Sequence, residues 1–156
     1  MKLRLVFVGR TRNPHFHRLT QDYLGRVQRF LPCEIREVKE PLRKDIRRRS
    51  AGLTEEDRLL FAFLEESPCS VLLDVEGQNV DSTEIAAFFK RQINFGLRRI
   101  DFLAGGPWGW SESVRSKAHN RWSLSRLTLP HEMVRVVLLE QIFRALARLN
   151  HFPYDK

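Results

Sequence analysis

The sequence predicts a single α/β domain with a mostly parallel sheet and helices on both of its faces. Short apolar runs rich in β-branched residues alternate along the chain with longer segments whose apolar residues recur at helical spacing. This alternation is typical of repeated strand–helix units. The chain has 156 residues, of which 42% are hydrophobic, and it contains no internal repeat or long linker. That size suits one domain around one core.

The first part of the chain predicts a strand, a helix and a second strand. Residues 3–8 form an apolar run that ends at Gly9. Apolar residues then recur at helical spacing through residues 16–30, and Pro32 ends this helix because proline cannot continue its hydrogen-bond ladder. Residues 35–38 predict the second strand.

A polar and basic stretch, residues 40–53, follows without steady periodicity. Thr54 and Asp57 then approximate a capping box, in which two side chains satisfy the first backbone N–H groups of a helix. Apolar residues within 59–64 continue this helix, and Pro68 closes it.

The second half of the chain repeats the pattern. Residues 70–75 predict a strand that Gly77 ends, and Asp81 with Glu84 predicts the start of a helix that stops at Gly96. The remaining predicted elements are a strand at residues 100–104, a helix capped by Ser111, a strand at residues 124–129 and a helix at residues 132–149.

The charge balance points to an anionic partner. Lys and Arg together number 27 against 19 Asp and Glu, which gives a formal net charge of +8. Two basic clusters stand out, the first formed by Arg10, Arg12, His15, His17 and Arg18, the second by Arg43, Lys44, Arg47, Arg48 and Arg49. Nucleic-acid binding and a solvated basic surface both fit this pattern.

Several classes of protein are excluded. No apolar run approaches the roughly 20 residues of a membrane helix, and the N-terminus alternates charged with apolar residues, so we expect a cytoplasmic protein without membrane contact. Cys33 and Cys69 lack CxxC spacing and a flanking His cluster. We therefore expect buried thiols and no bound metal.

Glycines gather where one buried strand ends, in the sequence IDFLAGGPWGWSESV of residues 100–114. In open parallel sheets ligands bind beyond the carboxyl ends of the strands, where glycine lets the backbone approach them closely. The segment lacks the GxGxxG fingerprint, so a tight turn and a ligand loop both remain open. Similar strand ends at residues 73–77 and 124–130 would complete one pocket if the strands are neighbours.

These segments resemble the ribosomal RNA large subunit methyltransferase H family of knotted SPOUT methyltransferases. The resemblance spans essentially the whole chain, from MKLRLVFVG through LDVEGQNVDSTEIAAFF and LAGGPWGWSESV to WSLSRLTLPHEMVRVVLLEQIFRAL and PYDK. It implies one SPOUT domain over residues 1–156 with a C-terminal trefoil knot, working as a homodimer without metal. It also implies methyl transfer from S-adenosylmethionine to N3 of a pseudouridine in the helix 69 loop of 23S rRNA, within assembled ribosomes.

The resemblance also implies the site residues. The cofactor would be held, largely through backbone groups, by Leu73, Gly105, Leu124, Ser125, Arg126, Leu127, Thr128 and Leu129. The RNA would be contacted by Arg10, Arg12, Arg135 and Tyr154. We expect the partner subunit to supply Arg10 or Arg12 to each site. The chain departs from the family pattern at Trp108 in the glycine turn and at Asp155, where a histidine is common.

The chemistry needs a group that helps the N3 imide lose its proton. His131 and Arg135 are the candidate catalytic residues, because they lie four residues apart at the start of the last helix and could share one face. His131 either accepts the proton or merely caps the helix. Arg135 stays charged and would instead stabilise the imide anion while water takes the proton, which is the route we favour. For Arg144 we expect a salt bridge to the partner subunit.

Two further expectations follow. Trp108, Trp110 and Trp122 are expected in the core or a dimer interface, and Gly105→Val is expected to abolish cofactor binding while leaving the fold intact. The alternative function is a basic RNA-binding dimer that keeps the SPOUT fold without transfer activity. Binding of S-adenosylmethionine separates the two functions.

Overall fold

The computed structural model describes residues 1–39, 55–105 and 109–154. Its elements in chain order are β1 (Lys2–Val8), α1 (Pro14–Gln28), β2 (Cys33–Val38), α3 (Glu55–Glu65), β3 (Ser70–Asn79), α4 (Ser82–Asn94), β4 (Arg99–Ala104), α5 (Glu112–Lys117), β5 (Asn120–Ser123) and α6 (His131–Leu149). The strands form one sheet in the order β2-β1-β4-β3-β5, and all neighbouring pairs are parallel. The predicted α/β class is confirmed.

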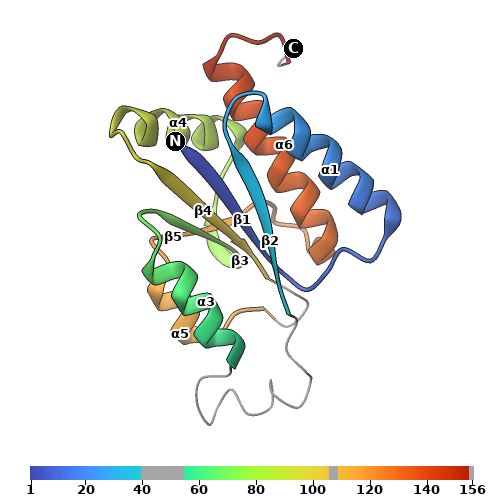
Figure 1. Ribbon diagram of the computed structural model, residues 1–156, viewed down its shortest axis with the longest axis vertical. Helices are drawn as coiled ribbons and strands as arrows, with labels where there is room; N and C mark the ends of the chain where they lie inside the picture. Colours follow the sequence, from blue (N-terminus) through green and yellow to red (C-terminus); the bar gives the residue numbers. More distant parts are fainter. Residues whose placement is uncertain (40–54, 106–108, 155–156) are drawn as a thin grey trace.

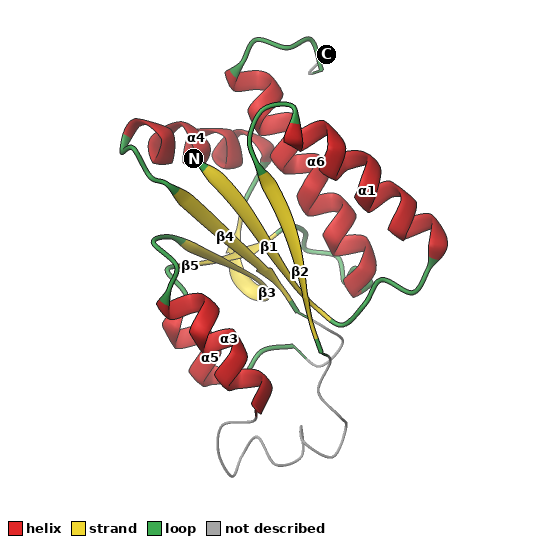
Figure 2. Cartoon of the chain, viewed as in Figure 1, coloured by secondary structure: helices red, strands yellow, loops and turns green. Residues whose placement is uncertain are grey.

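Helices cover both faces of the sheet, as Figures 1 and 2 show. Along β1, Leu5 and Phe7 join the larger core, which packs beneath α1, α4 and α6. Val6 and Val8 point the other way, into a smaller core beneath α3 and α5. This period-two alternation explains why residues 5–8 are all apolar, since both faces of the strand are buried.

The capping signals predicted for α4 and α5 are confirmed. Asp81 and Glu84 form a reciprocal capping box at the start of α4, and Gly96 follows that helix with a φ of 67°, in the left-handed region that favours glycine. Ser111 caps α5 by accepting a hydrogen bond from the backbone N–H of Val114. These interactions span two to four residues, so the sequence alone is enough to indicate them.

Two strand predictions are wrong. Residues 124–129 form a loop, because β5 ends at Ser123 and the chain then leaves the sheet. Gly77 does not end β3, which continues to Asn79 with a register shift against β5 between Leu73 and Gln78. A Cβ atom on Gly77 would lie 2.7 Å from backbone atoms of β5, so this glycine is needed for the close approach of the two strands.

Cys33 and Cys69 are free and buried, as predicted. Burial, together with the charge of Glu34, raises the pKa of the Cys33 thiol to about 12. In the part of the chain that the structure describes, no helix is both long and apolar enough to cross a membrane. The C-terminal trefoil knot stays a prediction.

Some predictions fall on residues outside the described ones. These are the second basic cluster with its polar stretch, Thr54 of the predicted cap, Gly106, Trp108, and the terminal Asp155 and Lys156.

Candidate cofactor and RNA site

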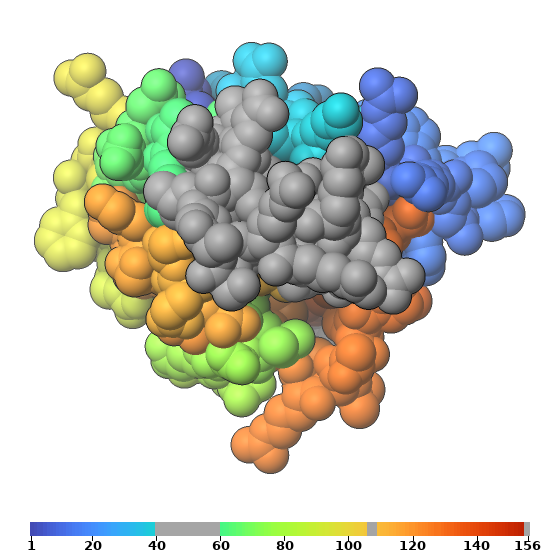
Figure 3. All heavy atoms as spheres, turned by 90° about the horizontal axis from the view of Figure 1, so that it is seen from below, coloured from blue at the N-terminus to red at the C-terminus, as the bar shows by residue number. Residues whose placement is uncertain are grey.

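The carboxyl ends of the parallel strands meet at one edge of the sheet. The connections after β1 and β3 lead to α1 and α4 on one face, whereas the connection after β4 leads to α5 on the other face. Neighbouring strands whose connections leave in opposite directions open a crevice at their carboxyl ends, the usual ligand site of such sheets. Figure 3 views the molecule from below, toward this end.

A pocket of about 80 Å³ lies level with the end of β4, between residues 73–75 of β3, the loop after β5 and the start of α6. Five predicted cofactor residues line it, namely Leu73, Leu124, Ser125, Leu127 and Leu129. Asp74 and Val75 of the predicted strand end 73–77 also line it, together with three residues that the prediction missed, namely Trp122, Ser123 and Val134. Gly105, Arg126 and Thr128 are not among the described residues that line the pocket. The arrangement brings two of the three predicted strand ends together.

The rim of this pocket is apolar and exposed. Val75 is 79% exposed and Leu127 is 74% exposed, although both side chains are large and apolar. The loop that carries Leu127 is organised by Ser125, whose hydroxyl accepts a hydrogen bond from the Leu127 backbone N–H at 2.9 Å and whose carbonyl accepts one from the Ser123 hydroxyl at 2.9 Å. Exposed apolar side chains at a pocket mark a surface that a ligand or partner covers.

Trp110 shapes the neighbouring strand end. Its indole Nε1 donates a hydrogen bond to the carbonyl of Leu73 at 2.7 Å. A Cβ atom on Gly105 would lie 3.1 Å from the Cε2 atom of the same indole, closer than most real Cβ contacts. Packing therefore explains the glycine at position 105, because the indole of Trp110 occupies the space that a side chain would need.

Asp74 places a buried negative charge beside the pocket. Its carboxylate lies 2.9 Å from Nε of Arg115 and 3.4 Å from Nη2 of Arg121. Arg115 also reaches the exposed Glu76, at 2.8 Å. Removing a carboxylate from water is costly unless cations compensate it, and here two arginines do so. The signal in the sequence is an aspartate inside an otherwise buried strand run.

The start of α6 separates the two candidate catalytic residues. His131 is the first residue of the helix and is half-buried, whereas Pro130 occupies the capping position without a side-chain cap, so the reading of His131 as a cap is wrong. Arg135 is fully buried. Its guanidinium donates to the carbonyl of Val8 at 2.6 Å and to the hydroxyl of Thr11 at 2.9 Å.

The exposed side chains of Arg10 and Arg12 lie on the segment that leaves β1. Glu132 holds this segment, because its carboxylate accepts hydrogen bonds from the backbone N–H groups of Arg12 at 2.8 Å and Asn13 at 3.1 Å. Partial burial raises the pKa of Glu132, but these two N–H groups and the charges of His131 and Arg135 outweigh it, so the net pKa is lowered.

Comparison with known proteins identifies the family. A family model described as a predicted SPOUT methyltransferase matches residues 1–155. The ribosomal RNA large subunit methyltransferase H of Trichlorobacter lovleyi is 40% identical over 156 residues, which cover 99% of each chain. The chain belongs to the ribosomal RNA large subunit methyltransferase H family.

Other relatives with the name ribosomal RNA large subunit methyltransferase H support this assignment. That of Geobacter metallireducens is 38% identical and that of Bacteroides thetaiotaomicron 34%, each over 154 residues that cover 99% of this chain and 98% of the relative. The structure of a probable methylase family protein from Haemophilus influenzae Rd KW20 superposes with a TM-score of 0.56 at 10% identity, over 99% of this chain and 70% of that chain. This likeness supports the fold alone.

Within this family fold, Tyr154 lies far along α6 from the pocket. Its hydroxyl contacts the Tyr23 hydroxyl at 3.4 Å and donates to Glu140 at 3.3 Å. The hydrogen bond with Tyr23, burial and the charge of Glu140 raise the pKa of Tyr154 to about 12. Glu140 is nine residues beyond His131, about 13 Å along the helix axis. Figure 1 shows the C-terminal tail at the opposite end of α6 from the helix start.

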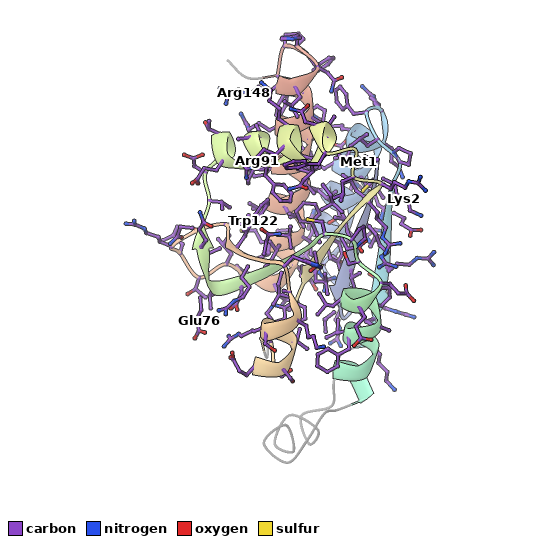
Figure 4. The ribbon with its side chains drawn as sticks, turned by 90° about the vertical axis from the view of Figure 1, so that its left-hand side faces the viewer. Met1, Lys2, Glu76, Arg91, Trp122 and Arg148 are labelled. Atoms are coloured by element: carbon purple, nitrogen blue, oxygen red, sulfur yellow. The ribbon has the colours of Figure 1, made fainter. Side chains whose placement is uncertain are left out.

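Two further predictions have an outcome, and that for Arg144 does not. Arg144 pairs with Glu140 of its own chain at 2.6 Å, and the expected salt bridge to a partner subunit stays a prediction. Trp110 and Trp122 are buried in the core, as expected. Trp122 packs its ring edge-on against Phe88 of α4 at 4.7 Å between centroids, and Figure 4 shows it below that helix.

Proposed function

We propose that this protein transfers a methyl group to ribosomal RNA of the large subunit, as the names of its relatives indicate for them, and that the methyl donor is S-adenosylmethionine. The target that we propose is N3 of a pseudouridine in the helix 69 loop of 23S rRNA within assembled ribosomes, so that the protein works in the cytoplasm. The observation that carries this proposal is a pocket at the carboxyl edge of the sheet, lined by the loop after β5 and lying close to an exposed basic segment.

The pocket residues fit the proposed cofactor in chemistry. An apolar rim that includes Val75 and Leu127 suits the faces of an adenine ring, and the backbone of residues 124–129 would hold its polar edge and the ribose. The pocket of about 80 Å³ in one chain is smaller than the 300–1,000 Å³ typical of small-molecule sites. When bound, the cofactor supplies the methyl group.

For the proton at N3, we assign the acceptor role to His131. It is half-buried at the first position of α6, between Leu129 and Val134 of the pocket lining. Arg135, which the sequence favoured as the stabiliser of the imide anion, is fully buried and bonded to its own chain. A substrate does not reach a guanidinium in that position, so the geometry argues against both its catalytic and its RNA-binding role.

We also propose that the protein works as a homodimer whose sites draw on both subunits. Within one chain Arg12 is bonded to Glu132, two residues before Val134 of the pocket, whereas Tyr154 contacts Glu140 much further along α6. The geometry therefore favours Arg10 and Arg12 from the same chain as the pocket and Tyr154 from the partner, the reverse of the sequence-based expectation for the arginines.

The test of activity uses ribosomes from a strain that lacks the gene. Incubation with the protein and S-adenosylmethionine should restore one methyl group on the helix 69 pseudouridine, located by mass spectrometry of RNase fragments. Leu127→Asp, which puts a charge on the pocket rim, should lose this activity and the calorimetric heat of cofactor binding while ribosome binding persists. Wild-type protein that binds ribosomes but gives no heat with the cofactor would be the non-catalytic RNA-binding dimer.

Mixed dimers test the assignment of residues to subunits. Mixing Tyr154→Ala with Leu127→Asp subunits leaves one intact site in each heterodimer, which should restore about a quarter of the wild-type activity at random exchange. Mixing Arg12→Glu with Leu127→Asp subunits should restore nothing, because no site then has both an intact pocket and an intact Arg12. Restoration by the second mixture, with exchange verified, would show that Arg12 acts on the partner's site.

A further inference from the structure

The segment of residues 9–13, which connects β1 to α1, is held by two side chains from the first turns of α6. Gly9, with a φ of 79°, turns the chain out of β1, and Asn13 caps α1. Between these points the segment has no regular secondary structure. Its position is therefore set by contacts with α6 rather than by its own backbone ladder.

Arg135 holds the start of this segment from inside the protein. Its side chain is fully buried, bonded to the Val8 carbonyl at 2.6 Å and the Thr11 hydroxyl at 2.9 Å, with the guanidinium 5.0 Å from the centre of the Phe7 ring. A buried guanidinium is costly unless its charge and its donors are satisfied. The side chain of Arg135, predicted from the sequence to contact the substrate, is thus directed toward the end of β1.

Glu132 holds the other end of the segment, one helical turn before Arg135. Its carboxylate accepts from the backbone N–H groups of Arg12 and Asn13, at 2.8 and 3.1 Å. Both contacts use main-chain atoms, so they fix the path of the segment and leave the side chains of Arg10 and Arg12 exposed on its surface. Charge-assisted hydrogen bonds of this kind are stronger than neutral ones.

We propose that Glu132 and Arg135 form a clamp that positions the segment of residues 9–13, so that Arg10 and Arg12 meet the RNA backbone from a fixed loop. Both are then positioning residues, and neither touches the substrate. The inference rests on the proposed function. It also explains why an acidic residue, Glu132, lies beside a surface that binds RNA. A preorganised loop loses less entropy on binding than one that must be ordered by the RNA.

Whether Glu132→Ala strengthens or weakens ribosome binding distinguishes the clamp from a simple surface charge. Removing a negative charge near bound RNA should strengthen binding if Glu132 acts only through its charge. The clamp predicts the opposite, because Glu132→Ala releases the loop. We expect about 10-fold weaker ribosome binding and a slope of log affinity against log salt that is shallower by about one to two phosphate contacts. Binding of S-adenosylmethionine should stay within about 2-fold.

A matched control is available at the same edge of the sheet. Glu37 is exposed on β2, next to Val38, whose carbonyl accepts from the Gly9 backbone N–H at 2.8 Å. Glu37→Ala should bind ribosomes as tightly as wild type or more tightly. Glu132→Gln, which keeps one acceptor oxygen, should lie between wild type and Glu132→Ala, and it serves as the test variant if the alanine variant folds poorly.

A double-mutant cycle tests whether the clamp acts through the arginines. In an Arg10→Gln/Arg12→Gln background, Glu132→Ala should weaken ribosome binding by less than about 2-fold, because no arginine is left to position. Arg135→Lys should raise KM for ribosomes with kcat within about 2-fold, whereas a group that stabilises the imide anion would lower kcat at saturating ribosomes. Equal losses in both backgrounds, or a fall in kcat alone, would overturn the proposal.

A readout without RNA completes the experiment. Backbone hydrogen exchange measured by NMR should be at least about 10-fold faster at Arg12 and Asn13 in Glu132→Ala than in wild type, with β1 unchanged. Unchanged exchange, or ribosome binding as tight as in Glu37→Ala, overturns the clamp alone. If wild-type protein does not bind ribosomes, the proposed function itself fails and the RNA role of the clamp falls with it.

Discussion

Gly105→Val should disturb the pocket through Trp110. The Cβ alone would lie 3.1 Å from the indole Cε2, so the two methyl groups of valine require the indole to move. Overpacking of this kind costs about 1–3 kcal/mol. Displacement of the indole also breaks its 2.7 Å hydrogen bond to the Leu73 carbonyl, worth about 1 kcal/mol. We expect a loss of about 2–4 kcal/mol, which leaves a domain of ordinary stability folded.

The assay combines urea unfolding with calorimetric titration of S-adenosylmethionine. Gly105→Ala is the graded control and should lose less stability than Gly105→Val, because its single methyl group needs a shift of only a few tenths of an ångström. Cofactor binding should weaken with Gly105→Val, since Leu73 lines the pocket and loses the bond that holds its carbonyl. This differs from the expectation that the valine simply blocks the pocket.

A Trp110→Phe background tests the cause. Phenylalanine lacks the outer ring of the indole, so Gly105→Val should cost less than half as much there as in the wild-type background. Equal costs in the two backgrounds would refute the reasoning, because the penalty would then arise from a neighbour other than Trp110.

Three other predictions follow from particular residues. Gly77→Ala should destabilise the protein by at least about 2 kcal/mol in urea unfolding, because its Cβ would lie 2.7 Å from the backbone of β5, whereas Gly25→Ala in α1 meets nothing within 4 Å and should stabilise it by about 0.5–1 kcal/mol. The lowered pKa of Glu132 stabilises the fold above the ordinary value of 4.5, and this is lost as the pH falls through the folded value. Thermal unfolding of wild type and Glu132→Gln should therefore differ at about pH 7 and converge once the pH falls below the lowered pKa of Glu132 in the folded protein. In an ultraviolet titration Tyr154 should remain protonated at about pH 11, and Tyr23→Phe should lower the pKa of Tyr154, because the hydrogen bond between the two hydroxyl groups is the largest cause of its raised pKa.

Local interactions made most of the fold predictable from sequence. The capping box of Asp81 and Glu84, the left-handed Gly96 and the cap at Ser111 each depend on atoms a few residues apart. The apolar runs of residues 5–8 in β1 and 102–104 in β4 indicated strands buried on both faces, which only a sheet covered by helices on both sides provides. The class of the fold follows from these signals taken together.

The candidate site was predictable only in part. The loop after β5 and Leu73 were found through their resemblance to a family, and they do line one pocket. The alternation in residues 124–129 predicted a strand, yet a strand also needs a neighbour with which to pair, and β3 pairs with residues 120–123 instead. Asp74 falls within the predicted strand end of residues 73–77, but its ion pairs were missed because Arg115 and Arg121 lie far away in sequence.

The sequence by itself determined the alternation of helices and strands, several of the helix caps, and that a basic segment follows the first strand. Only the tertiary structure decided the environment of individual side chains. Arg135 lies four residues from His131 on the same helix, but the packing of α6 against β1 buries one and leaves the other half-exposed. The physical reason is that burial and ion pairing depend on contacts between segments distant in the chain. The spacing of residues along one helix carries no information about those contacts.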